Sequence, residues 1–122
     1  MKKQFLLYFV LAFLLGMNLM GASYYVATSG NDSNNGSIGS PLKTLEKAVT
    51  LVQPGDYIYL RGGTYNMTVP SLVIDRSKSG SSSAMIRVHA YGSETPVLRF
   101  DGKENSSSRG IVQDAAYWHW KG

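Results

Sequence analysis

The sequence predicts a mainly β protein with one short α-helix, preceded by a separate export helix. Apolar residues recur at steps of three and four between Leu42 and Val52, as they do on one face of an α-helix. From Tyr57 onward the pattern changes to alternation in short segments separated by Gly, Asn and Ser, which is typical of strands and turns. With 43% hydrophobic residues, the 122-residue chain can form one small folded domain.

The first residues have the layout of a secretory signal peptide. Lys2 and Lys3 precede an apolar run from Phe5 to Leu15, and the small residues Gly21 and Ser23 follow it. Positive charge, an apolar run and small residues in this order are what the export machinery and a signal peptidase recognise. The apolar run is also shorter than the roughly 20 residues that a membrane-spanning helix needs.

We therefore expect cleavage after Ala22 or Ser23, so that residues 1–23 are the signal peptide and residues 24–122 are the mature domain. The mature protein is then secreted or held in the cell envelope, without contact to the membrane. An uncleaved membrane anchor is the alternative.

Charge and cysteine content exclude several classes of function. The chain has 12 Lys and Arg against 8 Asp and Glu, and removal of Lys2 and Lys3 leaves 10 against 8, a net charge of +2. This small excess is scattered singly along the chain, so nucleic acid is not an expected partner. The absence of cysteine excludes disulfides, thiol catalysis and zinc sites with Cys ligands.

The amphipathic helix is expected over residues 42–52. Pro41 suits the first turn or the approach to it, and Pro54 with Gly55 ends it sharply. Its apolar stripe predicts packing against the core.

The segments around this helix predict short strands. Their expected ranges are 24–27, 57–60, 64–69, 72–74, 85–91, 97–100, 111–112 and 117–122. In the clearest of them, Ile86, Val88 and Ala90 share one face while His89 and Tyr91 lie on the other. Strands of this kind could form a sandwich, a barrel or a solenoid, and periodicity alone does not choose among them.

The Gly, Asn and Ser-rich loop over residues 29–40 invites comparison with a calcium-binding loop. Counted from Asn31, however, the position that needs a bidentate acid is Leu42, so the loop is interpreted as turns stabilised by Asn and Asp side chains. The later carboxylates are also spread along turns rather than paired, and we expect them to be turn formers; they are Asp75, Asp101, Glu104 and Asp114. No residue is predicted to be catalytic, to bind a cofactor or to ligate a metal.

Carbohydrate contact is the one binding role that individual residues suggest. His89 and His119 are the two histidines, and both are expected on the outward side of their strands beside Tyr91 and Tyr117. A general base needs a substrate proton within reach and a partner that orients it, and the sequence indicates neither. Outward tyrosines offer flat apolar rings to a sugar, so Tyr91, His89, Tyr117 and His119 are the candidate contacts.

The order of several motifs resembles the N-terminal segment of right-handed parallel β-helix proteins, and among them the family-nine pectate lyases. The motifs are Tyr24-Tyr25-Val26, Gly30-Asn31-Asp32, Ser40-Pro41-Leu42-Lys43-Thr44-Leu45, and the run from Gln53-Pro54-Gly55-Asp56 through Gly62-Gly63-Thr64-Tyr65. The resemblance extends from Tyr24 to Gly122. It implies that the helix caps the first coil of a solenoid, where unpaired backbone groups would otherwise be exposed.

The resemblance also implies a function. Members of this family cleave acidic plant polysaccharide (pectate) by β-elimination, with bound calcium and a lysine base that lie several coils further along than this chain reaches. The chain is then an N-terminal fragment that is inactive alone, and calcium is expected only in its full-length parent. Two alternatives stay open: a non-catalytic β-helix surface, adhesion or carbohydrate-binding protein, and a small self-standing β domain.

Overall fold

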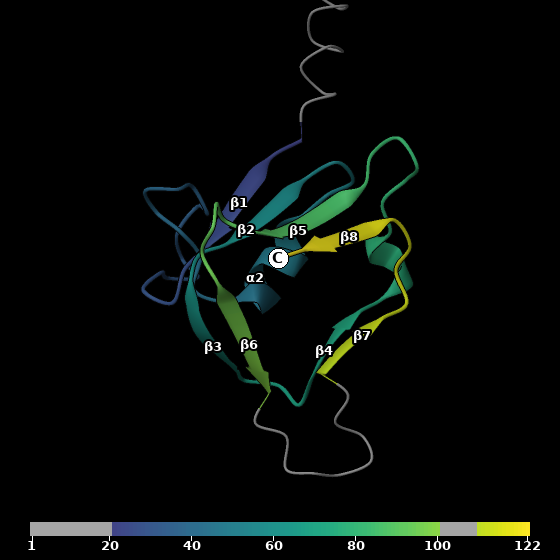
Figure 1. Ribbon diagram of the computed structural model, residues 1–122. Coiled ribbons are helices and arrows are strands. Elements are labelled where there is room, and N and C mark those ends of the chain that lie inside the picture. Colours follow the sequence, from purple (N-terminus) through teal and green to yellow (C-terminus); the bar gives the residue numbers. More distant parts are fainter. Residues whose placement is uncertain (1–20, 101–109) are drawn as a thin grey trace, which may run out of the picture.

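The structure is a computed structural model that describes residues 21–100 and 110–122. Its strands form three parallel sheets, of four, two and two strands (Figure 1). The elements are β1 (Ser23–Val26), α2 (Leu45–Leu51), β2 (Tyr57–Leu60), β3 (Gly63–Met67), β4 (Ser71–Ile74), β5 (Ile86–Ala90), β6 (Pro96–Phe100), β7 (Gly110–Gln113) and β8 (Trp118–Lys121), with a short 3₁₀ helix over Arg76–Lys78.

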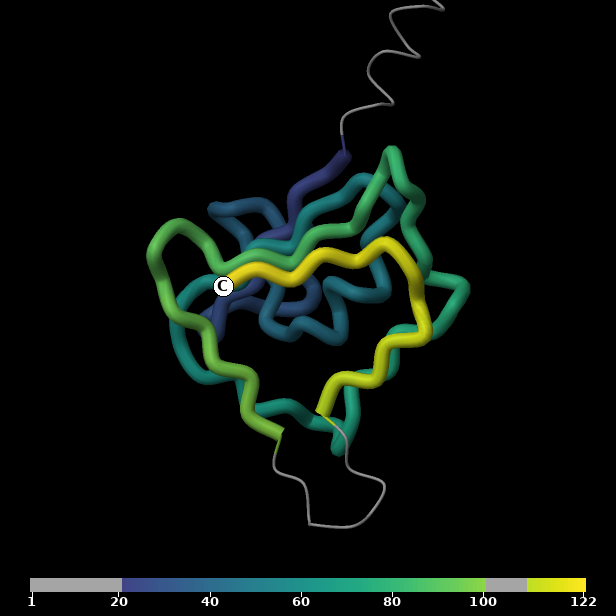
Figure 2. The backbone as a smooth tube through the Cα atoms, turned by 45° about the vertical axis from the view of Figure 1, so that its right-hand side comes forward, coloured from purple at the N-terminus to yellow at the C-terminus, as the bar shows by residue number. Residues whose placement is uncertain are grey.

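The order of pairing describes a winding ribbon. Strands β2, β3 and β4 form one coil, β5, β6 and β7 form the next, and β8 returns to the sheet that holds β1, β2 and β5. Figure 2 shows the coils lying over one another along this four-stranded sheet. Every pairing between the named strands is parallel. Among the described residues the structure is therefore a parallel β-helix, and the sandwich and barrel alternatives do not apply.

Alternation within the strands accounts for the core. In β2 the buried residues are Ile58 and Leu60, and in β5 they are Ile86 and Val88. Because the strands are parallel and in register, Ile58 lies beside Val88, so inward residues stack on inward residues from coil to coil. The expected strands agree with the observed ones within one or two residues at most ends.

Helix α2 packs against the first end of the stack, as expected of a cap (Figure 1). It buries Leu45, Ala48 and Val49, and Thr44 caps it by accepting a hydrogen bond from the backbone N–H of Lys47 at 3.1 Å.

The expected start of the helix was wrong, because Leu42 has its backbone engaged elsewhere. Its N–H donates to the carbonyl of Tyr25 and its own carbonyl accepts from Ala27, at 2.9 Å each, so Leu42 extends the parallel pairing beyond β1. A residue bonded in this way cannot also supply the first helical turn.

The polar loop over residues 29–40 is held by side-chain turns, as its composition predicted. Asn31 Oδ1 accepts from the N–H of Ser33, and Asn35 Oδ1 accepts from that of Ser37. Asp32 accepts from the backbone N–H groups of Lys43 and Thr44 and from the Thr44 hydroxyl, which ties the loop to the start of α2. Burial alone would raise the pKa of Asp32, but these hydrogen bonds outweigh it and the net shift is downward.

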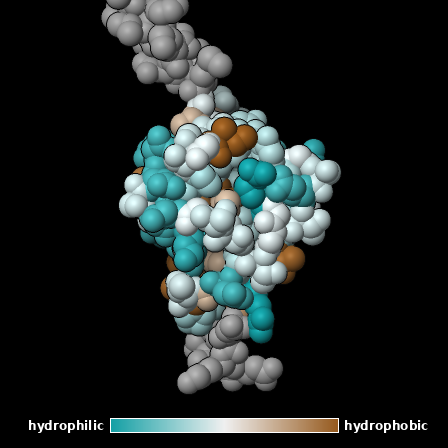
Figure 3. Space-filling model, turned by 90° about the vertical axis from the view of Figure 1, so that its left-hand side faces the viewer, coloured by the Kyte–Doolittle hydropathy of each residue, from teal (hydrophilic) through white to brown (hydrophobic). Residues whose placement is uncertain are grey.

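The outer surface carries no large apolar patch among the described residues. The large hydrophobic side chains that are exposed are scattered singly; they are Ile38, Val73, Val97 and Tyr117. On the face shown in Figure 3, hydrophobic residues form small separate spots among polar and neutral ones. Such a surface is ordinary for a folded protein.

Asp56 is a buried carboxylate at the first turn of the stack, 5% exposed. It accepts 2.8 Å hydrogen bonds from the backbone N–H of Ala22 and from that of Gln53, so it joins the chain before β1 to the end of the cap. Both donors would lose their partner if the side chain were removed.

Replacing Asp56 with alanine is expected to lower the free energy of unfolding by about 1–3 kcal/mol, the usual cost of leaving buried donors unpaired. Urea unfolding of the uncleaved chain measures it, because cleavage after Ala22 or Ser23 would remove one of the two donors. Asp114→Ala is the matched control, because its carboxylate pairs with Arg76 at the surface, 62% and 82% exposed, and should change stability little. Equal losses in both variants would contradict this role for Asp56.

Candidate functional site

The outer side of the four-stranded sheet carries a cluster of rings, which we call the aromatic face. It consists of Tyr25, Tyr57, Tyr59, Tyr91, His89 and His119. Alternation places these side chains outside because their neighbours in sequence, such as Ile58 and Val88, point into the coil. The register then brings Tyr25 beside Tyr59, and Tyr59 beside His89, on successive strands.

The tyrosines of this face contact one another. The rings of Tyr25 and Tyr59 stack with centroids 5.3 Å apart, and those of Tyr57 and Tyr59 stack at 5.5 Å. Tyr91, just beyond β5, sets its ring edge to face against Tyr25 at 5.7 Å and Tyr59 at 6.2 Å. These are favourable geometries for aromatic pairs, so the rings hold each other in place while staying only partly buried.

The two histidines continue the cluster toward β8. His89 Nε2 and His119 Nδ1 are 3.1 Å apart, a hydrogen bond in which one ring donates and the other accepts. Burial, followed by the charges of His119, Lys121 and Arg87, lowers the pKa of His89. At neutral pH His89 is therefore an uncharged imidazole. Its ring can donate a hydrogen bond to a ligand hydroxyl or accept one from it.

Cationic groups border the aromatic face. The guanidinium of Arg87 lies 5.3 Å from the centre of the Tyr57 ring, and that of Arg61 lies 4.8 Å from the Tyr91 ring. Arg61 is neutralised by Glu94, at 3.0 Å. Lys121 lies beside His89 in the register, so Arg87 and Lys121 give this surface a positive character that suits an acidic ligand.

The described residues do not fit a calcium site. Within residues 21–100 and 110–122, no three His, Cys, Asp or Glu side chains gather closely enough to hold a metal ion. Asp75 instead caps the 3₁₀ helix by accepting from Ser77, and Asp114 pairs with Arg76. Asp75 therefore has the turn role expected of it; Asp101 and Glu104 lie outside the described residues.

Three of the four predicted carbohydrate contacts belong to the aromatic face, namely Tyr91, His89 and His119. Tyr117 does not, because it makes none of the ring contacts found among the described residues. It precedes β8 in a left-handed conformation, φ 60°, and is half exposed. The contact role itself remains a prediction.

Sequence reasoning did not single out Tyr25, Arg61 or Arg87 as site residues. Tyr25 is separated from Tyr59 by the polar loop and the helix, so only the register of β1 on β2 brings their rings together. The available signal was the alternation of Tyr57 and Tyr59 with Ile58 and Leu60, which already indicated an outward tyrosine row.

Comparison with known proteins identifies the fold more closely. A model of the Pel9A-like right-handed β-helix region matches residues 24–122. The chain belongs to this Pel9A-like β-helix family. The match supplies the right-handed sense of the winding, in agreement with the resemblance noted from the sequence.

Individual relatives are pectate lyases. The chain is 43% identical over 105 residues to pectate lyase L of Paenibacillus polymyxa, covering 85% of this chain and 23% of that protein. It is 35% identical over 116 residues to pectate lyase PEL9 of Emericella nidulans, covering 84% and 27%. The crystal structure of pectate lyase Pel9A superimposes with a TM-score of 0.74 at 31% identity, covering 84% of this chain and 27% of that one. This Pel9A-like chain thus spans about a quarter of these relatives' length.

The histidine pair makes a testable prediction about pH. His89 is expected to titrate below the ordinary pKa of 6.5, and His119→Ala should move its pKa back toward that value, because one neighbouring charge is removed. Since the folded chain binds this proton less readily than the unfolded chain, stability should fall as pH drops through 6.5 toward the lowered folded pKa. NMR titration of the imidazole signals measures the pKa, and His89 titrating above 6.5 would refute the prediction.

Proposed function

We propose that the chain is the N-terminal part of an exported, calcium-dependent polysaccharide lyase that cleaves an acidic plant polysaccharide such as pectate by β-elimination. The family match over residues 24–122 is the observation that carries this proposal. The named relatives, both pectate lyases, give it a substrate class. We assign the elimination step and its calcium to other coils of the whole protein, because this chain spans about a quarter of the length of these relatives.

In this proposal the chain has two tasks. Helix α2 covers the apolar end of the first coil with Leu45, Ala48 and Val49. The aromatic face then binds the polymer, with tyrosine rings against the sugar faces and Arg87 and Lys121 near its carboxylates. Rings on three neighbouring strands suit a chain of repeated sugar units, since each strand offers a similar contact.

Export is part of the same proposal and rests on the layout of residues 1–23, of which residues 1–20 lie outside the described part. Among the described residues, no helix is both long and apolar enough to cross a bilayer. A polysaccharide outside the cell would be reached only after export.

A non-catalytic carbohydrate-binding or adhesion protein on the same scaffold is the second candidate. It is favoured by the position of the aromatic face, which lies wholly within this chain. This candidate predicts binding without calcium and no elimination product from any length of the protein.

The two candidates differ in one assay. The full-length protein, given polygalacturonate and calcium, is expected to release unsaturated uronates that absorb in the ultraviolet, and the 122-residue chain alone is expected to release none. Calcium removal with a chelator should stop the full-length reaction. A full-length protein that binds the polymer but never forms the unsaturated product would favour the non-catalytic candidate.

Polymer binding by the aromatic face is tested by Tyr59→Ala, which removes the ring that touches Tyr25, Tyr57 and Tyr91. We expect polygalacturonate affinity to fall about threefold to tenfold, the size of one lost aromatic contact. Calorimetric titration of the chain measures this. Val73→Ala is the matched control, because Val73 is 59% exposed on β4, in another sheet. Unchanged affinity in a folded Tyr59→Ala variant would exclude the aromatic face as the binding surface.

A further inference from the structure

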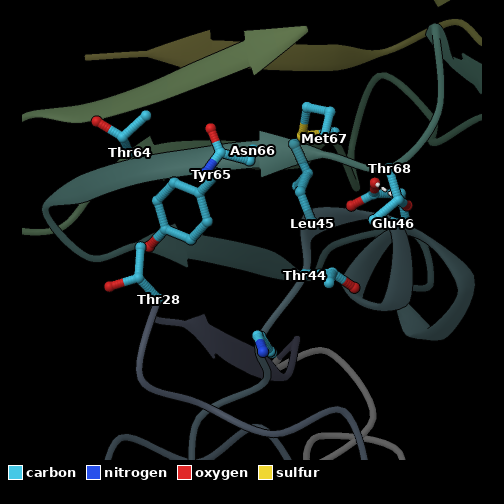
Figure 4. Close-up of a pocket in the computed structure, with 10 residues that line it drawn as sticks. Thr28, Thr44, Leu45, Glu46, Thr64, Tyr65, Asn66, Met67 and Thr68 are labelled. Carbon is cyan, nitrogen blue, oxygen red and sulfur yellow. Dashed lines mark hydrogen bonds between the residues drawn. The ribbon is translucent and has the colours of Figure 1, made fainter. Parts of the chain in front are cut away.

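The hollow between β3 and the segment that enters α2 does not form a ligand site (Figure 4). Tyr65 and Met67 are buried in the coil, while Thr64 and Asn66 lie on the exposed side of the same strand. Because successive residues of a strand point to opposite faces, a single ligand would not reach both pairs. Polar and charged groups that share one side are found instead on the four-stranded sheet.

Four basic side chains form a square on the outer side of β5 and β8, and we call them the basic square. They are Arg87 and His89 on β5, and His119 and Lys121 on β8. The register sets Arg87 beside His119 and His89 beside Lys121. All four point outward because alternation turns their neighbours, such as Val88, into the coil. Through His89 the square adjoins the tyrosines of the aromatic face.

The basic square is not neutralised by carboxylates within the part of the chain that the structure describes. The ion pairs in residues 21–100 and 110–122 are those of Arg61 with Glu94 and of Arg76 with Asp114. None of the four basic residues takes part in them. A group of cations without compensating charge raises the local potential and attracts an anion.

His89 and His119 meet on the diagonal of the square, where they can hold an additional proton. In the neutral pair, one ring donates across the 3.1 Å between His89 Nε2 and His119 Nδ1. A first added proton goes to the free nitrogen of the donor ring, so the hydrogen bond stays in place with a charged donor. A second proton would set two N–H groups against each other. The pair therefore gains one charge first, and the second only at lower pH.

The groups that face His89 come from three strands. From β2 they are the rings of Tyr57 and Tyr59, from β5 the guanidinium of Arg87, and from β8 the side chains of His119 and Lys121. Burial, and after it the positive charges among these groups, lowers the pKa of His89 below 6.5. His89 therefore adds its charge to the square only when the solution becomes acidic.

We propose that acidification strengthens the binding of an acidic polysaccharide at the aromatic face, because the basic square gains charge there. This inference rests on the polymer binding proposed above and adds its regulation by pH. A uronate carboxylate, like those of Asp and Glu, titrates near about pH 4. In mildly acidic solution the polymer therefore keeps its negative charge while the histidine pair becomes positive. By linkage, the bound polymer in turn favours protonation of the pair.

The test is a calorimetric titration of the chain with a galacturonate hexamer at about pH 5 and about pH 7.5, at equal ionic strength. The affinity is expected to be about twofold to fivefold higher at the lower pH, the size of one added charge at an exposed site. Near pH 6, binding should take up protons, so that the measured heat depends on the ionisation enthalpy of the buffer. The fully methyl-esterified hexamer carries no charge and should show neither effect.

Histidine variants assign the effect to the pair. The chain has two histidines, and the double variant His89→Gln and His119→Gln removes both imidazoles while keeping polar side chains of similar size. Its affinity for the acidic hexamer should be the same at both pH values, without proton uptake. His119→Gln alone should keep the gain but move its midpoint to higher pH, because one charge that opposes protonation of His89 is lost. Arg76→Gln is the matched control, since it removes a surface charge outside the square and should keep the gain.

The outcomes separate this inference from the proposed function. Equal affinities at both pH values, or a gain that persists in the folded double variant or with the esterified hexamer, would overturn the regulation by pH and leave polymer binding standing. A chain that binds the hexamer at neither pH would overturn both the polymer binding and this inference. Circular dichroism at each pH shows whether the chain and its variants are folded.

Discussion

Parallel, in-register pairing between successive coils is the constraint on which the rest of this structure depends. It sets each residue beside a residue of the same orientation in the next coil, so Ile58 meets Val88 and Val88 meets Trp120 in the interior. The same register sets Tyr59 beside Tyr25 and His89 outside. A slip of one residue would turn every inward side chain outward. The core and the aromatic face are thus two consequences of one register.

The cap satisfies a different requirement, because the first coil has no earlier coil to pair with. Helix α2 covers the end with Leu45, Ala48 and Val49, and two carboxylates hold the connections to it. Asp32 ties the polar loop to Thr44, while Asp56 ties the residues before β1 to the turn after the helix. A helix cannot continue the ladder of a strand, so it covers the end without pairing along β3.

The outcome for individual residues shows what local pattern can predict. Alternation correctly placed His89 outside and Val88 inside, because orientation within a strand depends only on neighbours in sequence. Leu42 fitted the helical period but joins a strand pairing, since its backbone bonds with Tyr25 and Ala27 prevail over the apolar stripe. Ring contacts depend on register between segments far apart, so neither the place of Tyr25 in the aromatic face nor the exclusion of Tyr117 was predictable from local pattern.

A coiled scaffold also relates the shape of the binding surface to the shape of a polymer. Each coil adds one strand to the four-stranded sheet, about 4.8 Å from the last strand. A polar or aromatic residue that recurs at the same position in successive coils therefore forms a row across the outer side of this sheet. Tyr25, Tyr59 and His89 already form such a row over three strands. Because a row repeats one contact, its total affinity grows with the number of units bound, which favours a polymer over a single sugar.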